Sequence, residues 1–459
     1  MISIANEANS SNLSILKYML LNSCIIVFSV FVFYFDSITL ILIMNVLLIL
    51  ASLWVVKFDI THPYTWFTPF YVLYTISFSL LFITNNLLVY MDISSLIQSL
   101  RLSWVGLITF LFVVSPKRYI SRIKKSNITY SISVANTLLI VSLIGIMLMS
   151  LYVLQSGAGS KKEIALSTSP ILTLGYYSIQ IYTLSYSMIL ISNLKRKEKL
   201  NRWFVGITIL IALLVIFVVG ERDFLLRITV VTLLIVNVFV RKLPVFKLVS
   251  YGVIGLFLIG ILQNLKNLFV SSDRAGSDQS NLMLTIFGGE FTSSGRNFYT
   301  LVNNNLDSFF SSNTTLISDI KYALLNLPFL QGETFTPTAW FNEVFYSEYV
   351  SSGGGKGFTL VGEGYLNYGV LGIVMWFAIL AFLVRLFYLR SRTNIYWFIG
   401  YILLIPMTIY CMRADLAILL SFIIKYILLP LCLIYIISYL NKNYNNGKVT
   451  LKKDLKNER

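Results

Sequence analysis

Long apolar runs alternate with short polar loops along most of the chain. A helix rises 1.5 Å per residue, so about 20 apolar residues cross about 30 Å of hydrocarbon. Alternating barrel strands are absent, which leaves helices as the spanning element. We predict an all-α polytopic membrane protein with about twelve transmembrane helices. The predicted spans are approximately 16–35, 37–56, 64–83, 99–115, 132–154, 170–192, 203–220, 223–240, 248–264, 364–384, 395–412 and 415–438.

One long segment, 265–359, is too polar for lipid and interrupts this pattern. Apolar spacing within it predicts short amphipathic helices at Asn281–Phe287, Phe298–Phe310 and Ile317–Leu327, which would lie on or in the membrane surface. The segment is therefore expected to fold as a cap over the helical bundle, and it is where we expect the functional site.

These features predict a linear organisation of the chain. It consists of an N-terminal membrane bundle of about nine helices (1–264), an extracytoplasmic loop or cap (265–359), C-terminal transmembrane helices (360–440) and a basic cytoplasmic tail (441–459).

Composition and charge support the membrane assignment. The hydrophobic share is 57% and the mean hydropathy is +0.77, whereas soluble domains have about 45–50% apolar residues. The net charge of +16 comes mostly from short loops that are two apolar runs apart. This positive-inside pattern places both termini in the cytoplasm and the long loop outside. It favours contact with anionic lipid and excludes nucleic acid as the partner.

Cysteine and histidine usage argues against metal chemistry. The three cysteines, Cys24, Cys411 and Cys432, lie in or at the end of apolar runs and indicate neither a disulfide framework nor a zinc site. His62 is the single histidine and falls on the cytoplasmic side, so a histidine-based metal site is excluded. We expect no metal and no cofactor.

Two arginines lie in or near one tight outer turn. Arg222 lies in the turn itself, within Gly220–Asp223, and is the better candidate for contact with a ligand. Arg227 lies one helical turn deeper, where a charge costs about 2.5–3.5 kcal/mol and needs a partner or water. Asp223 is four residues away and could pair with it on one helix face. Snorkelling to the outer headgroups is the alternative for Arg227.

Further arginines are expected on the same outer side. Arg413 and Asp415 form a second outer turn and, being two residues apart, do not share a helix face. Arg274 and Arg296 belong to the long loop. The planar guanidinium suits bidentate capture of phosphate, so convergence of these arginines would favour a diphosphate. Scattered arginines that pair with acids of the loop are the alternative.

Carboxylates near flexible glycines are candidates for a general base. Glu290 follows Gly289, and Glu363 lies between Gly362 and Gly364. Either carboxylate could accept the proton of a sugar hydroxyl, whereas helix capping or salt bridging is the alternative role. Lys356 lies in a glycine-rich run that lacks the positions of a phosphate loop, so we interpret the run as a hinge that opens into the tenth span.

Five short motifs resemble the oligosaccharide repeat-unit polymerases of bacterial surface polysaccharides, the Wzy-type O-antigen and enterobacterial common antigen polymerases. In chain order the motifs are His62-Pro63 with the aromatic run Phe67 to Tyr74; Gly220-Glu221-Arg222; Gly289-Glu290-Phe291 with Arg296-Asn297-Phe298; Gly362-Glu363-Gly364 with Tyr368-Gly369 and Gly372; and Arg413-Ala414-Asp415-Leu416.

The resemblance implies a metal-independent glycosyltransferase of the bacterial inner membrane. Such an enzyme moves a growing glycan from undecaprenyl diphosphate onto another lipid-linked repeat unit, beside a flippase and a chain-length regulator. Carried onto this chain, it implies diphosphate binding by Arg222, Arg274, Arg296 and Arg413 and a base at Glu290 or Glu363, with Arg227, Lys356 and Asp415 in support.

Other functions are compatible with the same pattern. A flippase for lipid-linked oligosaccharides is the rival from another class, although flippases seldom devote so much chain to one outer loop. The related ligases resemble this chain but use an outer histidine, and multi-span acyltransferases also need one. The single histidine, His62, is expected on the opposite face.

Overall fold

The computed structural model describes residues 2–86, 91–114, 132–156, 169–196, 202–221, 223–240, 242–244, 246–247, 250, 252, 255, 290–325, 334–351 and 355–439. Every regular element within these ranges is a helix, as predicted. The chain divides into two compact units. The first, which we call the cap unit, comprises Met1–Ser121, Leu243–Leu389 and Ile405–Leu420. The second unit comprises Arg122–Lys242, Arg390–Leu404 and Ser421–Arg459.

Helices coincide with each predicted span except 248–264, most of which lies outside the described residues. Six helices of the described chain are long and apolar enough to cross a membrane: Ile38–Val55, Pro63–Ile83, Ile93–Val114, Ile132–Gln155, Leu360–Arg390 and Leu416–Tyr439. Met19–Tyr34, Phe204–Val219 and Ile395–Cys411 are shorter apolar helices. The protein is therefore a helical membrane protein, and its full number of spans stays a prediction.

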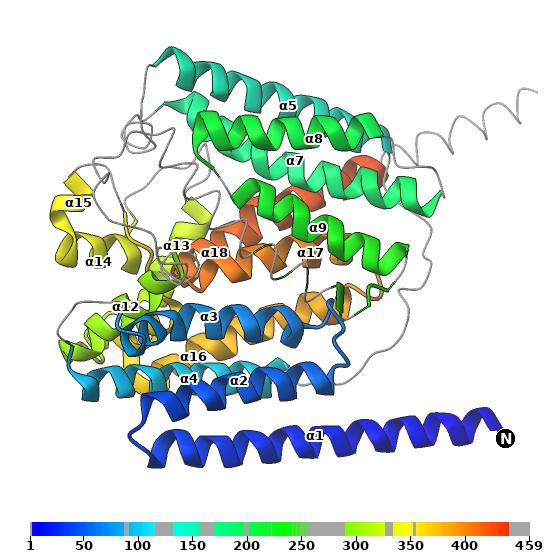
Figure 1. Cartoon of the computed structure of the whole chain (residues 1–459). Coiled ribbons are helices and arrows are strands. Elements are labelled where there is room, and N and C mark those ends of the chain that lie inside the picture. The colour runs from blue at the N-terminus through cyan, green and yellow to red at the C-terminus, as the bar shows by residue number, and fades with distance from the viewer. Residues whose placement is uncertain are drawn as a thin grey trace, which may run out of the picture. The chain divides into compact units, whose positions relative to one another are not determined.

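The cap unit begins with helices α1 (Ile2–Tyr34), α2 (Ile38–Val55), α3 (Pro63–Ile83) and α4 (Ile93–Val114), which run side by side in Figure 1. Many aliphatic side chains of α2 are exposed on the outer side of this layer, among them Ile43 (48%) and Leu50 (55%). Such exposure suits contact with lipid rather than water.

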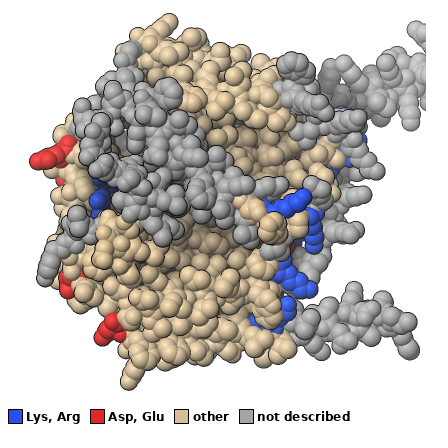
Figure 2. Space-filling model, in the orientation of Figure 1, with Lys and Arg blue, Asp and Glu red and all other residues tan. Residues whose placement is uncertain are grey.

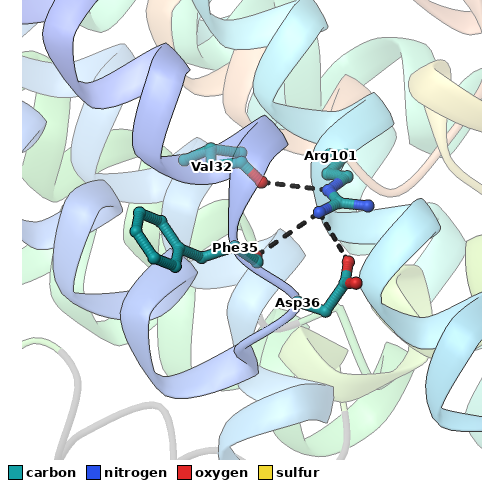
Figure 3. A network of polar contacts seen from close by, with 4 residues as sticks. All are labelled: Val32, Phe35, Asp36 and Arg101. Atoms are coloured by element: carbon teal, nitrogen blue, oxygen red, sulfur yellow. Dashed lines mark hydrogen bonds and ion pairs between the residues drawn. The ribbon is translucent and has the colours of Figure 1, made fainter.

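Arg101 of α4 closes the turn between α1 and α2 (Figure 3). Its guanidinium donates from Nε to the carbonyl of Val32 (2.9 Å) and from Nη2 to the carbonyl of Phe35 (3.4 Å) and the carboxylate of Asp36 (2.8 Å). The last carbonyls of a helix have no partner within the helix and carry a partial negative charge. Arg101 thus neutralises the end of α1.

The aromatic run of α3 packs against its neighbours. Phe67 stacks on Phe110 of α4, and the hydroxyl of Tyr71 donates to the carbonyl of Ser103 (2.7 Å). Gly106 allows this close approach, because a Cβ there would lie 2.9 Å from the Tyr71 hydroxyl. The buried His62 precedes α3, and its Nδ1 accepts from the Tyr64 N–H (3.2 Å) as an N-cap. The first family-like motif therefore has a structural role here.

The described part of the predicted loop forms α12 (Glu290–Asn303), α13 (Thr315–Leu325), α14 (Pro337–Phe345) and α15 (Ser347–Ser351). The predicted helix Ile317–Leu327 corresponds to α13, and Asn281–Phe287 lies outside the described residues. The prediction of a helix at Phe298–Phe310 is wrong in its bounds.

The end of α12 explains that difference. Asn305 adopts a left-handed φ of 51°, and the N–H of Leu306 turns back to the carbonyl of Leu301 (3.1 Å), so the helix cannot continue. Earlier in α12, Gly295 lies against α3, where a Cβ would be 3.0 Å from the carbonyl of Thr75. Because α12 packs on α3 and α4, the described part of the loop belongs to the same compact unit as the first helices.

The element α16 (Leu360–Arg390) is broken at Tyr368 and Gly369, where φ/ψ are −144°/33° and 55°/−131°. Gly364 and Gly372 meet across the break, since a Cβ on Gly364 would lie 2.8 Å from the backbone of Ile373. Side chains eight residues apart could not touch in a straight helix. The segment 360–367 is thus a separate half-helix, and the break lies inside the predicted span 364–384 rather than in the glycine-rich run that we interpreted as a hinge.

The second unit contains α5 (Ile132–Gln155), α7 (Pro170–Lys195), α8 (Arg202–Leu214) and α9 (Asp223–Phe239), and α5 packs closely on α7. Two π-helical turns, η1 (Val215–Val219) and η2 (Ile423–Leu428), interrupt its helices. The helices α17 (Ile395–Cys411) and α18 (Leu416–Phe422) each contribute residues to both units.

Candidate functional site

Three buried carboxyl groups meet in the cap unit: Asp319 of α13, Glu363 of the half-helix 360–367 and Asp415 before α18. All three residues are 0% exposed. Burial of unpaired carboxylates costs several kcal/mol per charge, so each needs donors or a proton. We call this set the carboxyl cluster.

Asp415 caps the N-terminus of α18 and also accepts a hydrogen bond from the first turn of α14, whose own N-cap is Thr336. Its Oδ1 accepts from the N–H of Ile418 in α18 (3.1 Å), and its Oδ2 accepts from the N–H of Thr338 in α14 (3.2 Å). The positive ends of both helices favour a carboxylate at this position. Burial raises the pKa of the Asp415 carboxyl, and the hydrogen bond with Thr338 acts in the opposite direction.

Glu363 joins α13 to α18. Its Oε1 accepts from the hydroxyl of Thr315 (3.0 Å), and its Oε2 accepts from the N–H of Leu416 (2.7 Å). Asn367, one turn along the half-helix, binds Thr315 through the backbone N–H (2.9 Å) and the hydroxyl (3.0 Å). The carboxylate is thus enclosed, and both of its oxygens accept hydrogen bonds. This geometry suits a residue that fixes α13 and α18 in place.

Asp319 differs from its two neighbours because no hydrogen-bond donor reaches either carboxylate oxygen within the described chain. Burial raises the pKa of Asp319, and the nearby carboxyl of Glu363 raises it further. A carboxyl group without donors and beside another carboxyl is held in its neutral form. Protonated Asp319 can then share its proton with Glu363, as coupled carboxyl pairs do.

Three of the predicted site residues in the cap unit are cationic: Arg296 of α12, Lys356 of the loop before α16 and Arg413 of the turn before α18. The guanidinium carbon of Arg296 lies 5.7 Å from the ring centroid of Tyr346, and Lys356 Nζ lies 5.9 Å from the same centroid. Two of these cations are therefore near the same ring, and Lys356 Nζ also lies 4.4 Å from the ring centroid of Tyr349. We call the three residues the cation group.

Arg413 joins this group through the backbone. The N–H of Phe358 donates to the Arg413 carbonyl (2.8 Å), and a Cβ on Gly357 would lie 3.1 Å from that oxygen. The hydroxyl of Ser294 on α12 donates to the carbonyl of Met412 (3.0 Å). These contacts therefore fix the turn, the loop and α12 relative to one another. In Figure 2 a small blue area is visible in the region of α14.

Two buried asparagines organise the cation group, and the sequence analysis did not select them. Asn297 donates to the carbonyl of Gly357 and accepts from the Tyr346 hydroxyl (2.9 Å). Asn342 accepts from the N–H of Lys356 (2.6 Å) and donates to its carbonyl (3.0 Å). The adjacency of Arg296 and Asn297 in a family-like motif was the available signal for the first. Nothing in the local sequence distinguished Asn342.

The guanidinium of Arg296 retains an enclosed donor. Its Nε is buried and has no hydrogen-bond acceptor among the described residues. The guanidinium lies near the ring of Tyr346. An unsatisfied buried donor costs about 1–3 kcal/mol. An anionic ligand that reached this atom would remove that cost.

Of the other predicted site residues outside the two groups, only Arg227 has a described side chain. Arg227 pairs with Asp223 within α9, as considered from the sequence, and its guanidinium carbon lies 5.4 Å from the ring of Phe422. Arg222 and Arg274 lie outside the described residues, as does the side chain of Glu290.

The described residues contain no group of three or more His, Cys, Asp or Glu side chains that could hold a metal ion. Glu363 and Asp415 accept hydrogen bonds from α13, α14 and α18, whereas the cation group offers positive charge that suits an anion.

The described residues define a helical membrane protein, one unit of which contains three buried carboxyl groups and the cation group. No family model matches the chain, and no curated protein or solved structure is detectably similar to it.

Proposed function

We propose that the chain is a polymerase of oligosaccharide repeat units that are carried on undecaprenyl diphosphate. The observation that supports this proposal best is that Arg296 and Lys356 both lie near the ring of Tyr346, while the backbone of Arg413 binds the 355–358 loop and its guanidinium lies over Tyr410. Among the described residues, the buried Nε of Arg296 has no hydrogen-bond acceptor. A diphosphate is negatively charged and carries several acceptor oxygens, and a guanidinium can bind two of these oxygens in a bidentate manner.

The proposed reaction is a glycosyl transfer. A hydroxyl oxygen of the acceptor sugar forms a bond to the anomeric carbon of the donor glycan, and the bond from that carbon to the diphosphate oxygen breaks. The leaving diphosphate keeps the electron pair, and the cation group stabilises its developing charge. The hydroxyl proton passes to a base, for which we propose Glu290. We propose a positioning role for Glu363, because its enclosed oxygens already accept two hydrogen bonds.

The proposed location is the outer face of the bacterial inner membrane, with about twelve spans and both termini in the cytoplasm. A flippase that supplies the lipid-linked units and a chain-length regulator would be its partners, and O-antigen or capsule-type polysaccharide would be the product. A reporter fused at Ser311 should be exported, whereas one fused after Lys199 should stay inside. A cytoplasmic signal from Ser311 would overturn this arrangement.

The proposal is tested by loss of chain extension. Arg413→Ala and Arg296→Ala should each lower polymerisation about 100-fold, as removal of one charge-stabilising donor does in other enzymes. The measurement is the length ladder of surface polysaccharide on a gel, with membrane levels of each variant determined in parallel. Lys242→Ala removes an exposed cation elsewhere and should leave the ladder unchanged.

Normal ladders from both arginine variants would end the proposal. Deletion of the gene separates the polymerase from its rivals. Loss of a polymerase leaves a single repeat unit on the surface, loss of a flippase leaves none, and loss of a ligase leaves full-length chains that are not attached to lipid core.

A further inference from the structure

Helix α13 is amphipathic in the inverse sense to a soluble surface helix. Its buried side holds the polar residues Thr315 and Asp319 with the small residue Ala323, at 1%, 0% and 0% exposure. Its exposed side holds the aliphatic residues Ile317 (70%) and Leu324 (50%), together with Ile320. A helix on a soluble protein would bury the aliphatic stripe and expose the carboxyl group.

The exposed residues of α13 form one continuous stripe. Ile317, Ile320, Lys321 and Leu324 are spaced at i, i+3, i+4 and i+7, which places them on the same face of a helix. Lys321 is the single charged residue of this stripe. A lysine among aliphatic residues at a membrane surface extends its ammonium group toward lipid phosphates while its methylene stem stays in the apolar layer.

An aromatic group lies beside the beginning of α13. The ring of Phe309 is 5.1 Å from Trp340, and Phe310 is 5.4 Å from Phe335. Phe309 and Phe335 are 52% and 40% exposed despite their size. Aromatic side chains of this kind are enriched where a membrane protein meets the headgroup layer.

The stripe begins next to a span whose surface already faces lipid. Asn367 binds the backbone of Thr315 at the start of α13, and the second part of α16 begins two residues after the break at Tyr368. Val370 and Leu371 at its beginning are 51% and 72% exposed. The apolar surface of α13 is therefore fixed close to the lipid-exposed start of a membrane-length helix.

We propose that α13 lies in the bilayer interface on the cap side, with Ile317, Ile320 and Leu324 among phospholipid acyl chains. Lys321 contacts the phosphates of anionic headgroups. The opposite face of the helix carries Asp319 of the carboxyl cluster and Thr315, whose hydroxyl donates to Glu363. The position of α13 in the interface therefore fixes the depth of the cluster relative to the bilayer. This inference does not depend on the polymerase proposal, because it concerns the surface of the cap and not its chemistry.

The test is photocrosslinking from α13 in lipid nanodiscs made of phosphatidylethanolamine and phosphatidylglycerol. A benzophenone amino acid replaces Ile317 in one variant and Ile320 in a second. The same label at Phe382, an exposed position in α16, is the positive control, and the label at exposed Glu348 in α15 is the negative control. Mass spectrometry identifies the adducts.

We expect phospholipid adducts at Ile317 and Ile320 with yields close to that at Phe382 and several-fold above that at Glu348. Adducts only with a second copy of the chain, with an isoprenoid glycolipid or with another segment of the same chain would overturn the proposal. Yields no higher than at Glu348 would overturn it as well.

A charge variant tests the role of Lys321 separately. With the label at Ile317, the adduct yield should be higher in nanodiscs that contain phosphatidylglycerol than in nanodiscs of phosphatidylcholine alone. Lys321→Glu should abolish that difference. A difference that persists in Lys321→Glu would exclude a headgroup contact by this lysine.

Discussion

The two units satisfy their buried charges by different means. In the second unit, Arg227 is 8% exposed and pairs with Asp223, four residues earlier in the same helix. In the cap unit, Asp415 and Glu363 accept hydrogen bonds from α13, α14 and α18, which lie far from one another in sequence. The first arrangement is local and can form within one helix, whereas the second exists only once the cap has assembled.

The difference has an energetic consequence. Removal of one partner of a local helical pair leaves the rest of the helix intact, so its cost is limited to the pair itself. Removal of a buried carboxylate such as Asp415 leaves two backbone N–H groups of different helices without an acceptor. The cap unit should therefore be the more sensitive of the two to single substitutions of charged residues.

Asp415→Ala is expected to have the largest effect. It removes the acceptor for the N–H groups of Thr338 and Ile418, which should lower the free energy of unfolding by about 2–4 kcal/mol. Thermal unfolding of the purified protein in detergent measures the loss. Asp415→Asn keeps an acceptor oxygen and should recover part of it. Equal stability of wild type and Asp415→Ala would show that this residue does not join the two helices.

The local pair in α9 should have a smaller effect. A double-mutant cycle of Asp223→Ala and Arg227→Ala should give a coupling energy of about 1 kcal/mol, because the two side chains are partly buried neighbours. Unfolding of the single and double variants supplies the values. A coupling energy as large as the Asp415→Ala effect would remove the distinction between local and assembled charge networks.

Asp319 should affect the pH dependence of stability more than stability itself. Burial and Glu363 raise its pKa in the folded protein, so the folded state binds this proton more tightly than the unfolded state. The resulting stabilisation is fully present below the unfolded pKa of about 4 and is lost as the pH rises toward the folded pKa. Asp319→Asn should flatten this decline. Identical pH profiles for variant and wild type would contradict a neutral Asp319.

The helical membrane fold can be predicted from the sequence because a membrane-length apolar run is a local property of consecutive residues. The pairing of Asp223 with Arg227 was accessible for the same reason, since four residues of separation define one helix face. The glycines before the tenth span predicted a hinge there, whereas the break at Tyr368 and Gly369 lies further along the chain, inside the predicted span 364–384.

The carboxyl cluster was not accessible in this way. Asp319 was not selected, because a single carboxylate in an amphipathic stretch has no local sign of burial, and its neighbours Glu363 and Asp415 are more than 40 positions away in the chain. The role of Asn342 depends on the backbone of Lys356, which folds back onto α14. Contacts of this type arise from tertiary packing, and no periodicity records them.

The most direct test of the cation group is an experimental structure of the protein in lipid nanodiscs with inorganic pyrophosphate. The account predicts pyrophosphate between Arg296, Lys356 and Arg413, with an oxygen within hydrogen-bonding distance of Arg296 Nε. Pyrophosphate bound elsewhere, or these three residues in separate surroundings without a common anion, would contradict it.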